Sequence, residues 1–225
     1  IAVRIARRVS KNQCQQVDTV VSPSAQMQAV LQQYGVTTPV TVIPTGLDAS
    51  RFVSGDGAAF RQKYDIPPQR PLLLYVGRVA YEKNILFLLE MLHLVIQDHP
   101  DVLLVITGEG PAEAMLKKMT KEKGLQQYVL FLGYLDREIG LNAAYQAADI
   151  FVFASKSETQ GLVLLEAMAQ STPVVAIAEL GTASILVQER GALIAEDDEV
   201  HFAEQVQTVR IDHQLRQRVG EQGRS

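Results

Sequence analysis

Residues 149–169 read DIFVFASKSETQGLVLLEAMA, and this stretch decides the fold class. It begins with a continuous apolar run at 150–154, continues through a short polar loop, and ends in an apolar segment with helical spacing that begins near Gly161. A strand made only of apolar residues is typical of a parallel sheet covered on both faces. The stretch therefore predicts a strand–loop–helix unit of an α/β protein.

The same order of strand and helix recurs along most of the chain. Short apolar runs predict further strands at residues 19–22, 40–43, 72–76, 102–107, 129–132, 173–178 and 192–194. Stripes with helical spacing lie at residues 85–96 and 112–119, and a last helix is predicted over residues 200–220. Strands that alternate with helices at intervals of about 20–30 residues predict βαβ units. We therefore expect a Rossmann-like three-layer α/β/α domain with a mainly parallel sheet.

The first 36 residues fit this pattern less well. Residues 1–17 predict an amphipathic helix whose basic face consists of Arg4, Arg7, Arg8 and Lys11, and a strand and a second helix up to Gly35 follow. We expect residues 1–36 to be the tail of a preceding domain with its linker, and residues 37–225 to form the main domain. The basic face could contact an anionic membrane, although a solvated helix face is the more frequent arrangement.

The composition argues against several classes of protein. The 225 residues carry a net charge of −4 without a basic block. This disfavours nucleic-acid binding, because that affinity comes mainly from neutralised phosphates. Cys14 is the single cysteine, and the four histidines are scattered, so we expect no disulfide and no metal site. No apolar run approaches the roughly 18–20 residues that span a bilayer. We expect a soluble, cytoplasmic piece of a longer protein.

Two glutamates of the stretch at 149–169 are candidate binding residues. A helix that begins at the carboxyl end of a parallel strand points its free N–H groups into the ligand crevice of the sheet. Glu158 lies on the loop before this helix, and Gly161 would let a phosphate approach the backbone. Glu166 lies in the second turn among apolar neighbours, which is unusual for a carboxylate. The alternative for Glu166 is a solvent-facing polar stripe that it forms with Gln170.

Two cations form a second candidate site. Gly77 and Arg78 come directly after the apolar run at 72–76, and Lys83 lies five residues beyond Arg78. Two cations at the carboxyl end of a strand suit a diphosphate, whose charge grows as it leaves. A solvated basic loop is the common alternative for such a pair.

A glycine turn follows the run at 102–107. It reads Gly108-Glu109-Gly110-Pro111, without the third glycine of a dinucleotide fingerprint, and the phosphate-loop motif GxxxxGK[ST] is absent from the chain. These absences disfavour a dehydrogenase and a P-loop nucleotidase. For Tyr134, near the end of the run at 129–132, we expect ordinary packing.

These motifs occur together in one order. PTGLD at residues 44–48 is followed by Phe52, by GR at 77–78 with KN at 83–84, by GEGP at 108–111, by FLG at 131–133 and by Glu158-x7-Glu166. In this order and spacing, residues 17–210 resemble the C-terminal, donor-binding domain of the retaining GT-B glycosyltransferases of family 4. The resemblance implies that the sheet domain is one half of a GT-B fold and that this half binds most of a nucleotide-sugar.

The resemblance also implies roles for the matching residues. Arg78 and Lys83 match the pair that grips the donor diphosphate and stabilises it as the leaving group. Glu158 matches the glutamate that contacts the transferred sugar, which completes the expected catalytic set, and Glu166 matches the one that hydrogen-bonds the ribose. The other expected donor-binding residues are Gly77, Leu135 in the base-binding loop, Thr159, Gln160, Gly161, Leu162 and Val163. Family members usually work without a bound metal, so we expect neither a metal nor a cofactor.

The expected partners follow from the same resemblance. They are a nucleoside-diphosphate sugar, most simply a UDP-sugar, and an N-terminal domain of the same polypeptide that would carry the site for a lipid or saccharide acceptor. The chain alone is therefore expected to bind the donor without transferring it. The sequences of residues 82–84 and 158–161 look most like those of bacterial enzymes that glucosylate diacylglycerol. This likeness also implies peripheral contact of the full-length protein with the inner face of the membrane. A non-catalytic nucleotide-sugar module and a sugar-nucleotide epimerase stay open as alternatives.

Overall fold

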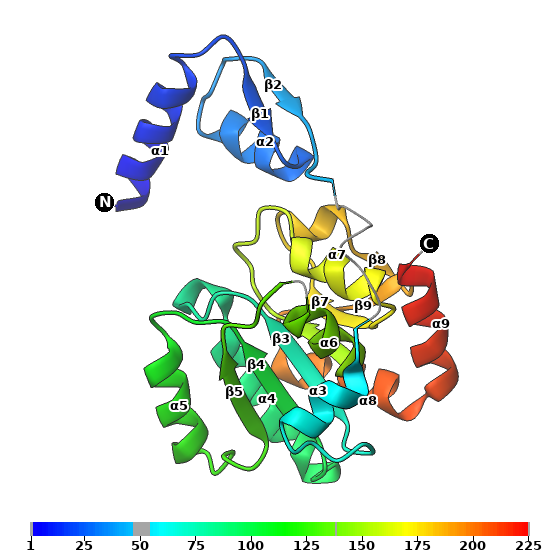
Figure 1. Ribbon diagram of the computed structural model, residues 1–225. Coiled ribbons are helices and arrows are strands. Elements are labelled where there is room, and N and C mark those ends of the chain that lie inside the picture. The colour runs from blue at the N-terminus through cyan, green and yellow to red at the C-terminus, as the bar shows by residue number, and fades with distance from the viewer. Residues whose placement is uncertain (1, 47–54, 138, 225) are drawn as a thin grey trace. The chain divides into compact units, whose positions relative to one another are not determined.

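The computed structural model describes residues 2–46, 55–137 and 139–224 (Figure 1). Contacts between residues divide the chain into two compact units. The first comprises the chain up to Gly46 together with Ser157–Gly161 and Glu179–Ile185, and the second comprises the remainder. Leu47, Asp48 and Phe52, which belong to the motifs quoted above, lie outside the described residues. The predicted domain division after residue 36 stays a prediction.

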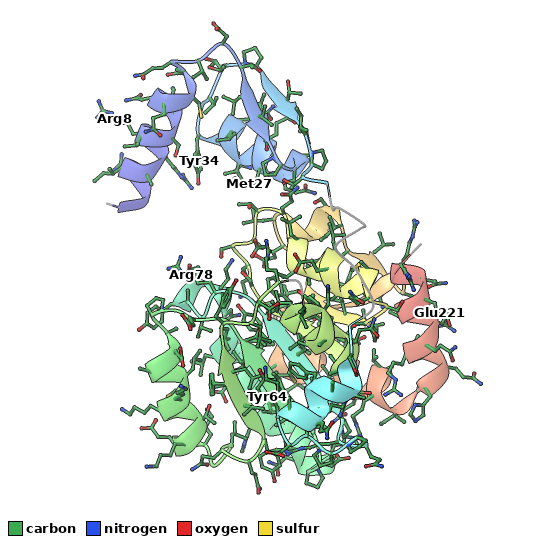
Figure 2. All side chains as sticks on the ribbon, in the orientation of Figure 1. Arg8, Met27, Tyr34, Tyr64, Arg78 and Glu221 are labelled. Carbon is green, nitrogen blue, oxygen red and sulfur yellow. The ribbon has the colours of Figure 1, made fainter. Side chains whose placement is uncertain are left out.

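The first unit contains a small α/β arrangement. Helix α1 (Ala2–Cys14) precedes β1 (Val20–Ser22), α2 (Ala25–Gln33) and β2 (Val40–Val42), and the two strands pair in parallel. The Ser24 side chain caps α2 by accepting a hydrogen bond from the Met27 amide. Tyr34, labelled in Figure 2, lies under the Arg7 guanidinium of α1, whose carbon is 5.2 Å from the ring centre. The predicted first helix is therefore present but ends at residue 14, three residues early.

The second unit is built on a seven-stranded parallel sheet. Its strands are β3 (Leu72–Val76), β4 (Leu103–Thr107), β5 (Val129–Gly133), β6 (Ile150–Phe153), β7 (Val174–Ile177), β8 (Val187–Gln188) and β9 (Gly191–Ala195). Their order across the sheet is β5-β4-β3-β6-β7-β9-β8, and all neighbours pair in parallel. All residues of β3, β4, β6 and β7 are buried. Because successive side chains of a strand point to opposite faces, both faces of the sheet are covered. The predicted α/β fold with a parallel sheet is confirmed, and the apolar runs locate its strands to within one residue, except for the two-residue β8.

Helices connect the strands. They are α3 (Gly57–Lys63), α4 (Ile85–Asp98), α5 (Glu113–Glu122), α6 (Gly140–Ala147), α7 (Leu162–Ala169), α8 (Glu199–Ile211) and α9 (His213–Gly223), with short 3₁₀ turns at Tyr81–Lys83 and Thr182–Ser184. The single helix predicted over residues 200–220 is wrong, because Asp212 leaves the helical conformation (φ −85°, ψ 93°) and separates α8 from α9. Its side chain then caps α9 by accepting from the Leu215 amide. No helix among the described residues is long and apolar enough to cross a membrane.

Helix α3 is held at the amino ends of two central strands. The Arg61 guanidinium donates to the Ala147 carbonyl and lies 3.0 Å from an Asp149 carboxylate oxygen. That same oxygen accepts a hydrogen bond from the Leu72 amide at 2.9 Å. Asp149 thus joins the starts of β3 and β6 to α3, and it fixes the two strands whose opposite ends carry the candidate site.

Candidate functional site

The order of the strands places a crevice at the carboxyl ends of β3 and β6. From β3 the chain winds outward through β4 to β5, and from β6 it winds the other way through β7 to β9. In a doubly wound parallel sheet, ligands bind beyond the carboxyl ends of the strands where the winding reverses. Asn84, which follows β3, links the two halves of the sheet here: its side-chain amide donates to the carbonyl of Ala154, directly after β6, at 3.3 Å.

Backbone hydrogen bonds join the loops that follow β3, β4 and β5. The Gly77 amide donates to the Thr107 carbonyl at 3.2 Å, the Val79 amide to the Glu109 carbonyl at 2.9 Å, and the Gly108 amide to the Gly133 carbonyl at 2.7 Å. A Cβ atom on Gly108 would lie only 2.0 Å from the Gly77 carbonyl oxygen, and φ at Gly108 is +110°. The glycine turn at 108–110 therefore permits this close approach of the loops.

A pocket of about 340 Å³ opens on this platform. It is lined by Val76, Gly77, Arg78, Thr107, Gly108, Glu109, Tyr134, Leu135, Arg137, Leu141, Val163 and Glu166. Five of these residues were expected from the sequence to bind the donor or to act on it: Gly77, Arg78, Leu135, Val163 and Glu166. They come from three separate parts of the chain, and the fold brings them to one cavity.

Glu166 is a half-buried carboxylate of this pocket. Its side chain is only 14% exposed. One carboxylate oxygen accepts a hydrogen bond from the Tyr145 hydroxyl at 2.9 Å, and the other lies 3.3 Å from an Arg137 guanidinium nitrogen. Gln170 is buried, and it donates to the Asn142 side-chain oxygen at 3.0 Å. The solvent-facing stripe of Glu166 and Gln170 is therefore wrong.

Burial raises the pKa of the Tyr145 hydroxyl well above its usual value, and the neighbouring Glu166 carboxylate adds to this rise. The hydroxyl therefore stays protonated and remains a hydrogen-bond donor to the carboxylate. Two donors on Glu166 offset the cost of placing its charge away from water.

The two expected cations differ in their position relative to the pocket. Arg78 follows β3 (Figure 2), lines the pocket and has a side chain 63% exposed, with its guanidinium 3.6 Å from the Glu82 carboxylate. Lys83 ends the 3₁₀ turn beyond Arg78 and, within the part of the chain that the structure describes, is not among the lining residues. An exposed ion pair of this kind contributes little to stability, so Arg78 can exchange Glu82 for an anionic ligand.

The expected residues before α7 belong to the first compact unit. Glu158, Thr159, Gln160 and Gly161 lie in its segment Ser157–Gly161, whereas Leu162 begins α7 in the second unit. Within the first unit, the Ser24 hydroxyl donates to the Thr159 carbonyl at 3.3 Å, and the Gly181 amide donates to the Glu158 carbonyl at 2.9 Å. Hydrogen bonds from Ser24 and Gly181 thus hold the backbone of this segment.

Three residues at or beside the pocket were not predicted as members of the site. Ordinary packing was expected for Tyr134, but its side chain is 70% exposed and lines the pocket, so that expectation is wrong. Arg137 and Tyr145 reach Glu166 from 29 and 21 residues earlier in the sequence. No group of three or more histidine, cysteine or acidic side chains suited to a metal ion occurs among the described residues.

Most of the chain matches known protein families. Residues 56–225 match the family described as Glycosyl transferases group 1, and residues 2–51 match the family described as Glycosyltransferase Family 4. The chain is 37% identical over 166 residues to the alpha-monoglucosyldiacylglycerol synthase of Streptococcus pneumoniae. That match covers 71% of this chain and 37% of the synthase.

Two solved structures share the fold. The sucrose-phosphate synthase of Thermosynechococcus elongatus is 29% identical with a TM-score of 0.82, and the match covers 98% of this chain and 55% of that one. The Anabaena protein HepE, solved in complex with UDP-glucose, is 22% identical with a TM-score of 0.89, over 98% of this chain and 62% of that one. The chain therefore spans less than two thirds of each of these relatives.

Proposed function

The chain belongs to the glycosyl transferases group 1 family, and on that premise we propose that it binds the nucleoside-diphosphate sugar donor of a retaining glycosyltransferase. The observation that carries the proposal is the pocket at the winding reversal, which contains a half-buried carboxylate, Glu166, and an exchangeable cation, Arg78. A carboxylate accepts hydrogen bonds from ribose hydroxyls, and a guanidinium binds phosphate oxygens in pairs.

The proposed role of each group follows from its chemistry. Arg78 and Lys83 hold the diphosphate, Glu166 holds the ribose, and the loop around Leu135 receives the base. Glu158 contacts the hydroxyls of the transferred sugar, with the backbone of Thr159, Gln160 and Gly161 and the start of α7 at Leu162 and Val163 beside it.

The proposed reaction transfers the glycosyl group with retention. The bond between the anomeric carbon and the diphosphate oxygen breaks, and the anomeric carbon bonds to an acceptor hydroxyl oxygen, whose proton passes to the departing diphosphate. The nucleoside diphosphate leaves with the bonding electron pair. The two cations stabilise the charge that grows on it, because fixed positive groups act most strongly where charge develops in the transition state.

The proposal extends to the base of the donor and to the class of acceptor. A UDP-sugar is the proposed donor, supported by the fold that the chain shares with HepE, which was solved with UDP-glucose. A lipid or saccharide acceptor is proposed, supported by the 37% identity to a synthase of a glucosyldiacylglycerol. Because the chain spans 37% of that synthase, we place the acceptor site in an N-terminal domain of a longer polypeptide. The chain alone then binds the donor without transfer.

The proposed enzyme is cytoplasmic and contacts the inner face of the membrane. The basic helix α1 of the first unit supports this contact. Arg4, Arg7 and Arg8 are exposed on α1, and a basic helix face attracts anionic lipid headgroups. A sugar-nucleotide epimerase is expected to need a histidine in the cleft, and the described lining residues include none.

Calorimetric titration with UDP-, GDP- and ADP-sugars tests the proposed donor. UDP-sugars should bind with the highest affinity, and UDP itself should compete with them for one site per chain. Binding of none of the three, with the chain folded, would overturn the proposed function. Tighter binding of a GDP- or ADP-sugar would keep the function and change the base.

Donor affinity should survive removal of divalent cations. Arg78 and Lys83 supply the positive charge that a metal would otherwise bring to the diphosphate. Titrating UDP in the presence and absence of a chelator should therefore give dissociation constants that agree within a factor of about three. A loss of more than about tenfold, roughly 1.4 kcal/mol, would require a bound cation at the diphosphate.

A further inference from the structure

The two oxygens of the Glu166 carboxylate are held by partners of different kinds. Oε2 accepts from the Tyr145 hydroxyl at 2.9 Å, and Oε1 lies 3.3 Å from the Arg137 guanidinium. The first partner is a buried, uncharged group on α6, and the second is a cation whose side chain is 66% exposed.

The Tyr145 side chain has little freedom to move. It is 1% exposed, and its ring packs against Phe151 of β6 with ring centres 5.7 Å apart. Its backbone is also held, because the Thr172 hydroxyl donates to the Tyr145 carbonyl at 2.9 Å. Beyond Glu166, the hydroxyl reaches the Val163 carbonyl oxygen, at the longer distance of 3.4 Å. A buried ring that packs against Phe151, on a backbone held by Thr172, brings its hydroxyl closest to Oε2 of Glu166.

Arg137 holds the other oxygen from the rim of the pocket. Both Arg137 and Glu166 line the cavity. A long, exposed arginine loses side-chain entropy when it is held in one conformation, and its ion pair is screened by water. A ligand hydroxyl in the pocket can therefore replace or share the Arg137 contact on Oε1, whereas Oε2 already accepts a hydrogen bond from a buried ring.

We propose that Tyr145 is a positioning residue, which orients the Glu166 carboxylate so that Oε1 faces the ribose hydroxyls of a bound nucleotide. This inference rests on the proposed function, because it requires a nucleotide in the pocket. Tyr145 touches no ligand in this arrangement and acts only through Glu166.

The test compares two nucleotides on one variant. Tyr145→Phe removes the hydroxyl and keeps the ring, and the two ligands are UDP and dideoxy-UDP, which lacks both ribose hydroxyls. Tyr145→Phe should weaken UDP binding by about fivefold to tenfold, the effect of one ordinary hydrogen bond, because Glu166 keeps its charge and loses only its orientation. The affinity for dideoxy-UDP, which does not use Glu166, should stay within about twofold of the wild-type value.

A double-mutant cycle with Glu166→Gln tests whether Tyr145 affects UDP binding through Glu166. In the Glu166→Gln background, Tyr145→Phe should produce no further loss of UDP affinity, since both changes remove the same oriented carboxylate. The matched control is Tyr64→Phe, which removes a tyrosine hydroxyl at the end of α3, outside the described lining of the pocket. It should leave both affinities unchanged.

The outcomes separate the inference from the function on which it rests. Equal losses for UDP and dideoxy-UDP in Tyr145→Phe would show a general packing defect and overturn the positioning role, as would an undiminished loss in the Glu166→Gln background. Both results leave UDP binding to the wild type intact. Failure of the wild-type chain to bind UDP at all would instead overturn the proposed function. Unchanged dideoxy-UDP binding in Tyr145→Phe also verifies that the variant is folded.

Discussion

Glu166→Gln should weaken the binding of UDP and of a UDP-sugar together, by roughly 10-fold to 150-fold. Glutamine keeps the size of the side chain but removes the charge that accepts hydrogen bonds from ribose hydroxyls, and a bond to a charged group contributes about 1.5–3 kcal/mol. Its amide would also turn donors toward the Arg137 guanidinium or the Tyr145 hydroxyl, which now hold the carboxylate. Isothermal titration with both ligands measures the loss.

Glu158→Gln is the matched comparison on the other glutamate. Glu158 is proposed to contact the transferred sugar, and UDP carries no sugar, so this variant should keep the UDP affinity and lose affinity for the UDP-sugar only. In a full-length enzyme it should also lower the turnover rate more than Glu166→Gln does. If Glu166→Gln changes neither affinity, Glu166 has no part in donor binding and the proposed site loses its main support.

Gly108→Ala should destabilise the fold by about 2–5 kcal/mol. The backbone there has a φ of +110°, and a methyl group would meet the Gly77 carbonyl oxygen at 2.0 Å. A left-handed conformation costs an L-residue roughly 1–2 kcal/mol, and forced overlap in a packed region costs about 1–3 kcal/mol more. Urea unfolding measures the change in the free energy of unfolding. Because the clash lies in the platform of the pocket, UDP affinity should fall as well.

Gly124→Ala separates the two causes. Gly124 also has a positive φ, +69°, but a methyl group there would meet nothing within 4 Å. This variant should cost only the conformational part, roughly 1–2 kcal/mol, and should leave UDP affinity unchanged. Equal destabilisation by the two substitutions would mean that the loops after β3 and β4 relax without cost, and that their close contact does not shape the pocket.

The strands were predictable from the sequence because burial on both faces requires continuous apolar runs. The runs at 72–76 and 150–154 coincide with β3 and β6 to within one residue. Helix α6 was not predicted, because six of its eight residues are buried and no polar face produces a helical stripe. Helix α3 was not predicted either, since its position depends on the contact of Arg61 with Asp149, 88 residues later. The break at Asp212 was missed because aspartate caps a helix as readily as it lies on the surface of one.

The candidate site was predictable where a residue was out of place in its own segment. Glu166 is a carboxylate among apolar helix residues, and Arg78 follows a buried strand, so both could be identified, and both line the pocket. Arg137 and Tyr145 show no such local signal: an arginine on a loop and a tyrosine in a buried helix are ordinary. Only the fold brings them to Glu166. The roles of Lys83 and Glu158 stay predictions, since neither residue is among the described lining residues of the pocket.

Hydrogen–deuterium exchange with and without saturating UDP tests most directly whether the nucleotide binds at the winding reversal of the sheet. The loops at residues 77–79, 107–110 and 133–137 and the start of α7 should exchange more slowly when UDP is bound, because each of these segments contributes residues to the lining of the pocket. Glu166→Gln at the same UDP concentration should lose most of this protection. Slower exchange confined to other segments, with these loops unchanged while UDP is bound, would contradict the assignment of the site.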